Sequence, residues 1–402
     1  MTTTVYLIRH AEAEGNVYRR CHGIYDSGLT PQAYRQLPYL AARFEKVPLD
    51  AVYASNLYRA RHTAKAIADR KGMKVIIRPE LHEIDMGDWE DRTWAVLPRI
   101  APEQFAVWNA RPWDCVVPNG ETVMAAGDRV LAELHRIVQA RMGQTLAVVS
   151  HGSAIRSILC RVLGLPQEQI GEIGWADNTC VAKLLFEDDG AVHAEYWNDA
   201  SHLPQELSTF ASVGWSNTRA TPQTIQVWFR NYDPENAEDR ALFLSFVHEH
   251  YRSAYGTDAN VDDTAKLAQA AAASAVSRRA VTFGMLDDKP VVLVFLDAAD
   301  LHDPAVGMVG GYCIAPEYRG SGLSRMVIGQ SISVYRELGR EYLCAAVAEQ
   351  NERAKGFYRK FAFEQRGEKI NECGRHFLMF KRIHIDTLEE ESEQFDLSER
   401  NI

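Results

Sequence analysis

The stretch Val5-Tyr6-Leu7-Ile8-Arg9-His10-Ala11-Glu12 lies near the N-terminus and decides the fold that we predict. Its first four residues are apolar and partly β-branched, which is typical of a short buried strand, and charged residues follow at once. In an open α/β sheet, ligands bind outside the carboxyl ends of the strands. We therefore expect an α/β domain whose chemistry takes place around Arg9 and His10.

The composition indicates a soluble globular protein. The chain has 402 residues, of which 46% are hydrophobic and 24% charged, a size that suits two domains. Its net charge of -10 gives no basic footprint for nucleic acid, so we expect small-molecule partners. No leader-like segment precedes Arg9, and no apolar run approaches the ~18 residues that span a bilayer. We expect a cytoplasmic protein without membrane contact, and the oligomeric state stays open.

The cysteines are scattered along the chain. There are seven of them, and none forms a Cys-x-x-Cys pair. An odd number without paired spacing predicts neither a disulfide framework nor a zinc site. We therefore expect reduced thiols and no metal.

Three further predicted strands in the first half each lead to a polar side chain. They are 50–55 before Arg59, 74–78 before Glu83 and 145–149 before His151. Strands of a parallel sheet end at a common edge, so we expect these side chains to lie close to His10.

These residue types suit the transfer of a phosphoryl group. A phosphomonoester carries nearly two negative charges, and Arg9 and Arg59 can each bind its oxygens through two N–H groups. A neutral His10, held through its other ring nitrogen, can attack phosphorus. A protonated His151 would add positive charge, and Glu83 could protonate the leaving alcohol and then activate water.

The same residues carry a family resemblance. The run from Leu7 to Glu12 resembles the Leu-x-Arg-His-Gly/Ala-Glu signature of the histidine phosphatase superfamily, in the phosphatase branch of its phosphoglycerate mutase-like enzymes. Residues 55–64 and 81–83 match the family's Ser-x-Leu-x-Arg-Ala-x-x-Thr-Ala and Leu-x-Glu elements, and the resemblance covers about residues 4 to 200. It implies a three-layer α/β domain with a phosphorylated histidine. The implied catalytic residues are His10, Glu83, His151, Arg9 and Arg59.

Two segments refine this expectation. We expect the loop after His10 to contact the substrate through Asn16, Arg20 and Gly23. The family's mutases use a longer covering insertion after the proton donor, whereas the segment after Glu83 is short and favours a phosphatase. A phosphoglycerate-type mutase stays the alternative. Four tryptophans in this segment predict an apolar cap over the pocket: Trp89, Trp94, Trp108 and Trp113.

A second domain follows residues 204–223, a segment without periodicity that predicts a linker. Its predicted elements are strands at 224–230, 280–286, 290–296 and 342–348 and helices at 234–255 and 262–274. A further strand ends at Ile314 and runs through Pro316 into a Gly-rich loop that opens a helix. Such a loop presents unpaired backbone N–H groups at a helix N-terminus and can bind an anion.

This loop resembles the pyrophosphate-binding loop of the GNAT acyltransferase superfamily, Arg/Gln-x-x-Gly-x-Gly/Ala, and residues 351–363 resemble the family's Asn-x-x-Ala-x-x-Phe-Tyr block. The resemblance implies a mixed α/β GNAT domain, acetyl-CoA as co-substrate and a small amine as acceptor. It assigns Tyr358 as the proton donor to the leaving thiolate. The implied cofactor-binding residues are Ile314, Arg319, Gly320, Ser321, Gly322, Leu323, Ser324 and Asn351.

The general base of the second domain is left open among Glu317, Glu349, Asp297 and water. Ser324 and Ala362 depart from the small residues that the family usually has there, so the alternative is an inactive domain that senses acyl-CoA or serves as a scaffold. Cys313 and Arg319 also form a Cys-x5-Arg arrangement like that of cysteine phosphatases. We exclude that chemistry because Pro316 removes an amide that the phosphate would need.

Together these patterns predict four regions. They are a histidine phosphatase domain at 1–203, a linker at 204–223, a GNAT domain at 224–383 and an acidic, solvated tail at 384–402. We expect a bifunctional enzyme that hydrolyses a small phosphomonoester through phosphohistidine and N-acetylates a small amine with acetyl-CoA. A shared substrate for both halves and fusion for co-expression alone are the two explanations that stay open.

Overall fold

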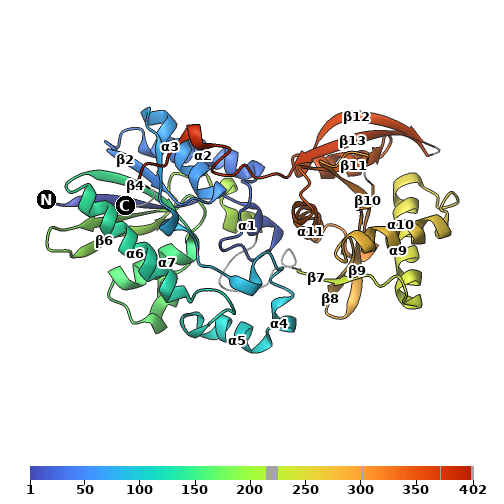
Figure 1. The fold of residues 1–402 in the computed structure, drawn as a ribbon, viewed down its shortest axis with the longest axis horizontal. Coiled ribbons are helices and arrows are strands. Elements are labelled where there is room, and N and C mark those ends of the chain that lie inside the picture. Colours follow the sequence, from blue (N-terminus) through green and yellow to red (C-terminus); the bar gives the residue numbers. More distant parts are fainter. Residues whose placement is uncertain (214–224, 301, 372, 400–402) are drawn as a thin grey trace. The chain divides into compact units, whose positions relative to one another are not determined.

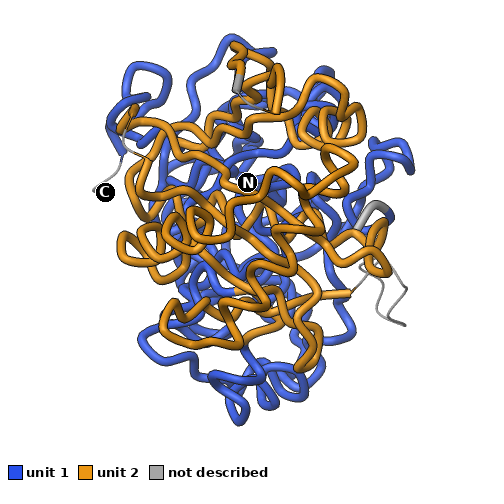
Figure 2. The backbone as a smooth tube through the Cα atoms, turned by 90° about the vertical axis from the view of Figure 1, so that its right-hand side faces the viewer, with its two compact units in different colours: residues 1–92, 97–219, 385–402 blue, residues 93–96, 220–384 orange. Residues whose placement is uncertain are grey.

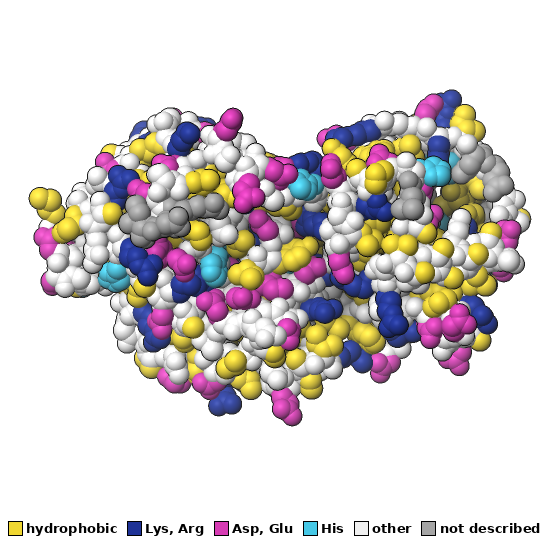
Figure 3. Space-filling model, viewed as in Figure 1, with side chains coloured by type: hydrophobic (Ala, Val, Ile, Leu, Met, Phe, Trp, Pro, Cys, Tyr) yellow, Lys and Arg dark blue, Asp and Glu magenta, His cyan; other side chains and the backbone are white. Residues whose placement is uncertain are grey.

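The computed structural model describes residues 1–213, 225–300, 302–371 and 373–399 (Figure 1). The chain divides into two compact units (Figure 2). Unit 1 consists of residues 1–92, 97–219 and 385–402, and unit 2 of residues 93–96 and 220–384. The face of the molecule in Figure 3 carries acidic and basic side chains interspersed with one another, in keeping with a chain that has charges of both signs.

Unit 1 is built on a sheet that has seven strands within the described residues, in the order β14-β3-β2-β4-β1-β5-β6. The strands are β1 (Thr3–Arg9), β2 (Ala51–Ala54), β3 (Val75–Ile77), β4 (Thr145–Ser150), β5 (Val181–Phe186), β6 (Val192–Asp199) and β14 (Phe395–Asp396). The strands from β14 to β1 run parallel, and β5 and β6 are antiparallel to their neighbours. The central strands are buried on both faces, which is why β1 and β4 are almost continuously apolar.

Helices cover both faces of this sheet (Figure 1). They include α1 (Glu14–Tyr18), α2 (Pro31–Phe44), α3 (Tyr58–Lys71), α4 (Leu97–Ile100), α5 (Pro102–Ala110), α6 (Val123–Ala140) and α7 (Gly152–Val162). Leu40 and Phe44 of α2 and Ile67 of α3 pack with Ile8 and Val149 of the sheet in one core. In the figure α2 and α3 lie on one side of the strands, and α6 and α7 lie on the other. The expected three-layer α/β architecture is confirmed.

Unit 2 is also built on a sheet, with the order β12-β13-β11-β10-β9-β8-β7 among the residues described. The strands are β7 (Trp228–Asn231), β8 (Val281–Leu286), β9 (Lys289–Asp297), β10 (Val306–Ile314), β11 (Tyr342–Ala348), β12 (Glu364–Asn371) and β13 (Gly374–Arg382). The helices are α9 (Ala237–Tyr255), α10 (Asp263–Val276), α11 (Ser324–Glu337) and α12 (Glu352–Lys360). Strands β10 and β11 run parallel and the other neighbouring pairs antiparallel, which confirms the mixed α/β class.

Strands β10 and β11 part half-way along their length. Their pairing runs from Val306 to Val309 on β10 and does not continue toward Ile314. On the other edge of β10, the register with β9 shifts between Val309 and Gly311, so Gly310 is the extra residue of a β-bulge. A Cβ atom at Gly310 would lie 2.6 Å from the ring of Phe295, so only glycine fits there. The bulge and the parting of the strands open the sheet at its centre.

The predicted linker is wrong over its first half. Residues 205–213 form a 3-10 turn and helix α8 (Thr209–Val213), and Leu207 is only 2% exposed. The Gln36 side chain on α2 donates hydrogen bonds to the Leu207 carbonyl (2.8 Å) and to Thr209 Oγ1 (3.2 Å). These residues therefore belong to unit 1. Sequence reasoning missed them because such short turns bury side chains without a periodic pattern. Residues 214–223 of the expected linker lie outside the described residues.

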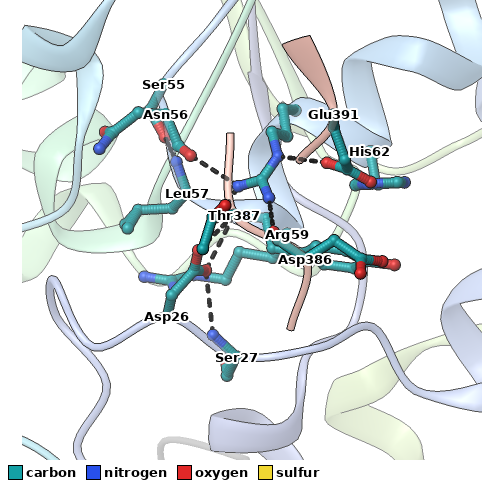
Figure 4. A network of polar contacts seen from close by, with 12 residues as sticks. Asp26, Ser27, Ser55, Asn56, Leu57, Arg59, His62, Asp386, Thr387 and Glu391 are labelled. Carbon is teal, nitrogen blue, oxygen red and sulfur yellow. Dashed lines mark hydrogen bonds and ion pairs between the residues drawn. The ribbon is translucent and has the colours of Figure 1, made fainter. Parts of the chain in front are cut away.

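The solvated tail predicted at 384–402 is also wrong for the residues described. Phe395 and Asp396 form β14, which pairs parallel with β3 at the edge of the sheet of unit 1. Glu391 is 6% exposed and binds Arg61 and His62 of α3 (Figure 4). Glu391 is not solvated because Arg61 and His62 bind it, whereas Glu389, Glu390 and Glu393 of the same segment are exposed.

Candidate functional site

The register of the central strands brings two histidines together in unit 1. Arg9 on β1 lies opposite Ser150 on β4, so His10 and His151 follow side by side, with ring centroids 5.1 Å apart. His10 Nδ1 donates to the Ala11 carbonyl (2.7 Å), which leaves Nε2 as the nitrogen with a free lone pair. Burial, and then the cations of Arg59 and Arg9, lower the pKa of His10 well below 6.5. His10 is therefore neutral and its Nε2 is nucleophilic.

His151 lacks a partner on one ring nitrogen. Its Nε2 lies 2.7 Å from Ser55 Oγ, at the end of β2, while its buried Nδ1 has no hydrogen-bond partner among the described residues. A buried polar atom without a partner marks a place for a ligand or water. Burial, followed by the charge of Arg59, lowers the pKa of His151 well below 6.5. Burial therefore favours the neutral form of His151 over the protonated form considered from the sequence.

Arg9 and Arg59 are buried cations without a counter-ion. They are 5% and 2% exposed, and neither forms an ion pair within the described part of the chain. Arg59 donates to the carbonyls of Gly23 (2.5 Å) and Tyr25 (3.0 Å), and Arg9 donates to the carbonyl of Ala176 while its Nε has no partner. Burial lowers the pKa of both groups. Nearby carboxylates, Asp177 for Arg9 and Asp26 for Arg59, oppose this lowering without contacting the guanidinium groups directly. A buried charge without a direct ionic partner is costly, so these residues favour binding of an anion.

The side chain of Glu83 lies against the N-terminus of α7. Its carboxylate accepts three backbone N–H groups at 3.0 Å, from Ile84, Ser153 and Ala154. Ser153 and Ala154 belong to the first turn of α7, which begins directly after His151. The five side chains that sequence reasoning assigned to catalysis in the first domain are thus brought to one edge of its sheet.

A cavity of about 390 Å³ lies where β10 and β11 part. Six residues that the sequence assigned to cofactor binding or catalysis line it: Ile314, Arg319, Gly320, Ser324, Asn351 and Tyr358. The loop before α11 needs glycine, because Gly320 and Gly322 have φ angles of 82° and 87°. The first turn of α11 has no side-chain cap at Leu323, and its amides at Arg325 and Met326 donate to the carbonyls of Gly322 (3.2 Å) and Leu323 (3.0 Å). The helix N-terminus still favours an anion through the helix dipole.

Several of the predicted cofactor-binding residues, including two that line the cavity, have partners within the protein. The side chain of Leu323 is buried in the core, so the loop offers the backbone of this residue only. Ser321 Oγ donates to the Tyr318 carbonyl, and Arg319 binds Glu249 (2.7 Å). Asn351 caps α12 through its side-chain oxygen. Ser321, Gly322 and Leu323 are not among the residues that line the cavity.

Tyr358 and His250 face the same cavity. Burial raises the pKa of Tyr358 well above 10, so its phenol keeps its proton. His250, on α9, donates from Nδ1 to the Tyr312 carbonyl (2.9 Å), and burial lowers its pKa, so a neutral ring has Nε2 free to accept a proton. Sequence reasoning missed His250 because it lies in a helix more than sixty residues before the glycine loop and in no motif.

Comparison with known proteins identifies both halves. Residues 5–200 match the model of the histidine phosphatase superfamily (branch 1), and residues 237–363 match that of the acetyltransferase (GNAT) family. Phosphoserine phosphatase 1 of Hydrogenobacter thermophilus is 31% identical over 182 residues, which cover 45% of this chain and 86% of that protein. The chain belongs to the histidine phosphatase superfamily. As a member of this superfamily it is an enzyme of the phosphatase class, and its second half contains a domain that matches the acetyltransferase (GNAT) family.

Other relatives of this histidine phosphatase have different names. Adenosylcobalamin/alpha-ribazole phosphatase of Escherichia coli is 32% identical and covers 41% of this chain and 81% of its own. A probable phosphoglycerate mutase, GpmB, of Serratia proteamaculans is 36% identical, covering 40% and 75%. Among solved structures, YhfR of Bacillus stearothermophilus has 29% identity and a TM-score of 0.48, and the match covers 50% of this chain and 98% of that chain.

No helix in the described ranges is long and apolar enough to cross a bilayer.

The three predicted substrate contacts differ in burial and in the partners that the protein gives them. Gly23 offers its carbonyl to Arg59, and Asn16 lies half-buried on α1. Arg20 forms a buried ion pair with Asp91 (2.5 Å), which holds the pKa of that carboxyl well below its usual range. Arg20 therefore has a protein partner, and its contact with substrate stays a prediction.

Two acidic residues that sequence reasoning missed organise the loop at 23–26. The Glu90 carboxylate accepts the backbone N–H groups of residues 23, 24 and 25 at 2.7 to 3.0 Å, and burial raises the pKa of Glu90. Asp26 accepts the N–H of Tyr58 (2.8 Å) at the start of α3 (Figure 4). The loop is thus held so that its carbonyls meet Arg59. Glu90 lies seven residues after Glu83, but no sequence pattern connects it with this loop.

The structure bears on the acidic candidates for the general base of the GNAT domain and on the thiol of Cys313. The three acidic candidates do not line the cavity among its described residues: Glu317, Glu349 and Asp297. Cys313 is buried in β10, and its burial raises the pKa of the thiol to about 11. It is therefore a thiol rather than a thiolate at neutral pH, which agrees with the exclusion of cysteine phosphatase chemistry.

Proposed function

We propose that the first domain hydrolyses a small-molecule phosphomonoester through a phosphohistidine on His10. The observation that carries this proposal is the pair of buried arginines without counter-ions, Arg9 and Arg59, beside a neutral histidine with a free Nε2. Both guanidinium groups can bind phosphoryl oxygens and stabilise the charge that develops on them. The names of the phosphoserine and alpha-ribazole phosphatases among the relatives support hydrolysis, and that of GpmB supports the mutase alternative.

The reaction follows in two displacements. Nε2 of His10 attacks phosphorus, the bond to the alcohol oxygen breaks, and that oxygen takes a proton from Glu83. Glu83 then accepts a proton from water, whose oxygen attacks phosphorus, and the N–P bond breaks to release phosphate and neutral His10. If the Ser55 hydroxyl donates its hydrogen bond to His151 Nε2, the ring proton of neutral His151 is on Nδ1. The Nδ1–H group can then donate a hydrogen bond to a phosphoryl oxygen.

Trapping the intermediate tests this proposal. Rapid quenching during turnover of p-nitrophenyl phosphate, followed by peptide mass spectrometry, should locate the phosphoryl group on His10. His10→Ala should abolish turnover, whereas His193→Ala, at an exposed histidine of β6, should leave it unchanged. Phosphate on another residue, or activity in His10→Ala, would refute the assignment.

We also propose that the second domain transfers an acetyl group from acetyl-CoA to a small amine. The supporting observation is the cavity between the parted strands, with the open glycine loop at one end and Tyr358 and His250 in its wall. The amine nitrogen attacks the thioester carbon and loses a proton to His250 Nε2. The C–S bond breaks, and the thiolate takes the proton of Tyr358.

Binding and turnover can be separated by three variants. Gly322→Glu places a strained side chain and a negative charge at the loop, so calorimetry should show no acetyl-CoA binding. Gly339→Glu is its control, because Gly339 also has a positive φ (70°) but lies just beyond the other end of α11. Tyr358→Phe and His250→Gln should retain binding and lower acetylation of an amine panel scored by mass spectrometry. Tight binding without acetylation of any amine by the wild type would favour the sensor alternative.

A further inference from the structure

A hollow in unit 1 has Ser153, a hydrogen-bond partner of Glu83, in its wall. Its volume is about 410 Å³, within the range of small-molecule sites, and its walls come from residues 108–123, α7 and residues 168–175. Because Glu83 is the proposed donor to the leaving alcohol, the alcohol part of a substrate would extend into this hollow.

Arg156 is the cation of this hollow. It follows Ser153 by three residues on α7, so the two side chains share one face of the helix, and both are half-exposed. Its guanidinium lies 4.4 Å from the ring centroid of Trp175, and its Nε donates to the Ile170 carbonyl (3.1 Å). No carboxylate within the described ranges pairs with it; Glu168, on the exposed rim, is not within ion-pair distance. The terminal N–H groups of Arg156 are therefore available to a ligand.

The other walls of the hollow would strengthen the interaction of Arg156 with a bound anion. Three half-buried indole rings line it: Trp108, Trp113 and Trp175. Apolar walls displace water, and an ionic hydrogen bond is stronger where the dielectric constant is low. Partial burial also lowers the pKa of Arg156, as expected for a cation that has lost some of its hydration.

We propose that this hollow is the leaving-group subsite of the phosphatase, and that Arg156 binds a carboxylate on the alcohol part of the substrate. The proposal rests on the proposed phosphatase function of the first domain. A planar guanidinium with free terminal donors matches the two oxygens of a carboxylate, and its stacking on Trp175 fixes the plane in which they must lie. The substrate class is then a phosphorylated hydroxy acid or phosphorylated hydroxyamino acid.

Substrates that differ only in the carboxylate test the proposal on the full chain. O-Phosphoserine and O-phosphoethanolamine differ by that group alone, 3-phosphoglycerate carries it without an ammonium group, and p-nitrophenyl phosphate reports on the phosphoryl-transfer machinery. The wild type should favour the two carboxylates. Arg156→Gln should lower kcat/KM for them by about 10- to 100-fold, mainly through KM, since a hydrogen bond to a charged group is lost. The other two substrates should change by less than about twofold.

Two further variants control for charge and for folding. Arg156→Lys keeps the charge without the planar fork and should restore only part of the activity on carboxylates. Arg161→Gln removes a cation from the same helix, where Arg161 pairs with Asp128 at the surface (2.8 Å), and should not change substrate preference.

The outcomes separate this proposal from the one on which it rests. An equal loss on all four substrates in Arg156→Gln would mean that Arg156 only positions Trp175 and the loop at 170, and would overturn the subsite. Turnover of p-nitrophenyl phosphate without any preference for carboxylates in the wild type would overturn it too, while the phosphatase assignment would stand. Hydrolysis of none of the four would overturn both.

Discussion

Glu391→Ala should destabilise the phosphatase domain strongly. The Glu391 carboxylate lies beside His62 (Figure 4) and binds its Nε2 (2.8 Å) and Arg61 Nε (2.8 Å). Arg61 is 1% exposed. The remaining acceptors of Arg61 are the carbonyls of Asn56 and Asp386, which carry no charge, and the one-third exposed carboxylate of Asp26 at a longer distance (3.4 Å). Removing one partner of a buried ion pair costs about 3–5 kcal/mol. That is a large share of the roughly 5–15 kcal/mol by which domains are stable.

Urea unfolding of the full chain, followed by tryptophan fluorescence and by residual p-nitrophenyl phosphatase activity, measures this cost. Glu389→Ala is the matched control, because it removes an exposed carboxylate from the same segment and should change stability by less than about 0.5 kcal/mol. The double variant Arg61→Met/Glu391→Leu should regain most of the loss, since it leaves neither charge buried. If Glu391→Ala unfolds with the same midpoint as Glu389→Ala, the ion pair does not stabilise the domain and the reasoning is wrong.

Two other predictions concern the phosphatase site. Glu83→Gln should slow the hydrolysis of alkyl phosphates far more than that of p-nitrophenyl phosphate, because nitrophenolate leaves without a proton; steady-state rates that fall equally on both would remove Glu83 from the donor role. Burial holds the pKa of His10 and His151 below 6.5, so the folded state binds fewer protons than the unfolded state below that pH. Stability should therefore be maintained above pH 6.5 and fall below it by about 1.4 kcal/mol per pH unit for each histidine. His10→Ala should remove one such contribution from the urea-unfolding free energy between about pH 6 and 5, and a slope identical to that of the wild type would contradict it.

The arrangement of the phosphatase site could be predicted because its side chains follow strands. His10, Arg59, Glu83 and His151 each come soon after a short apolar run, and parallel strands end at one edge of a sheet. The order of the strands was not needed for this inference. The pairing of Arg9 with Ser150 then places the two histidines together. The clustering of these side chains was therefore predicted from local strand patterns and from the rule that parallel strands end at one edge of a sheet.

The supporting residues could not be predicted because they act through backbone groups distant in the chain. Glu90 binds three consecutive amides of a loop more than sixty residues earlier, and Asp26 caps a helix that begins at Tyr58. His250 depends on the carbonyl of Tyr312, on another element of the fold. Backbone amides and carbonyls are the same in every residue, so no pattern of side chains signals these contacts in advance.

The acidic C-terminal segment shows why composition alone misjudged the domain boundary. Low apolar content and negative charge predict a solvated tail when the charges have no partners. Here the partners are in unit 1: Glu399 pairs with Arg141 (3.1 Å) and Arg78 (3.6 Å), as Glu391 pairs with Arg61. Residues 385–399 thus complete a phosphatase domain whose other parts precede the GNAT domain, which makes the GNAT domain an insertion rather than an appendage.

This connectivity changes how the fusion must be tested. A cut between residues 213 and 225 would leave the C-terminal segment attached to the GNAT domain and still bound to the phosphatase domain through β14 and Glu391. The two halves would remain associated, so unchanged activity after such a cut would say nothing about a shared substrate. A phosphatase domain expressed as residues 1–213 would instead lack β14 and Glu391, the shorter of the two carboxylate contacts of Arg61, whereas Arg78 would keep its ion pair with Glu133. Co-expression alone does not explain a fusion in which one domain needs chain from beyond the other in order to be complete.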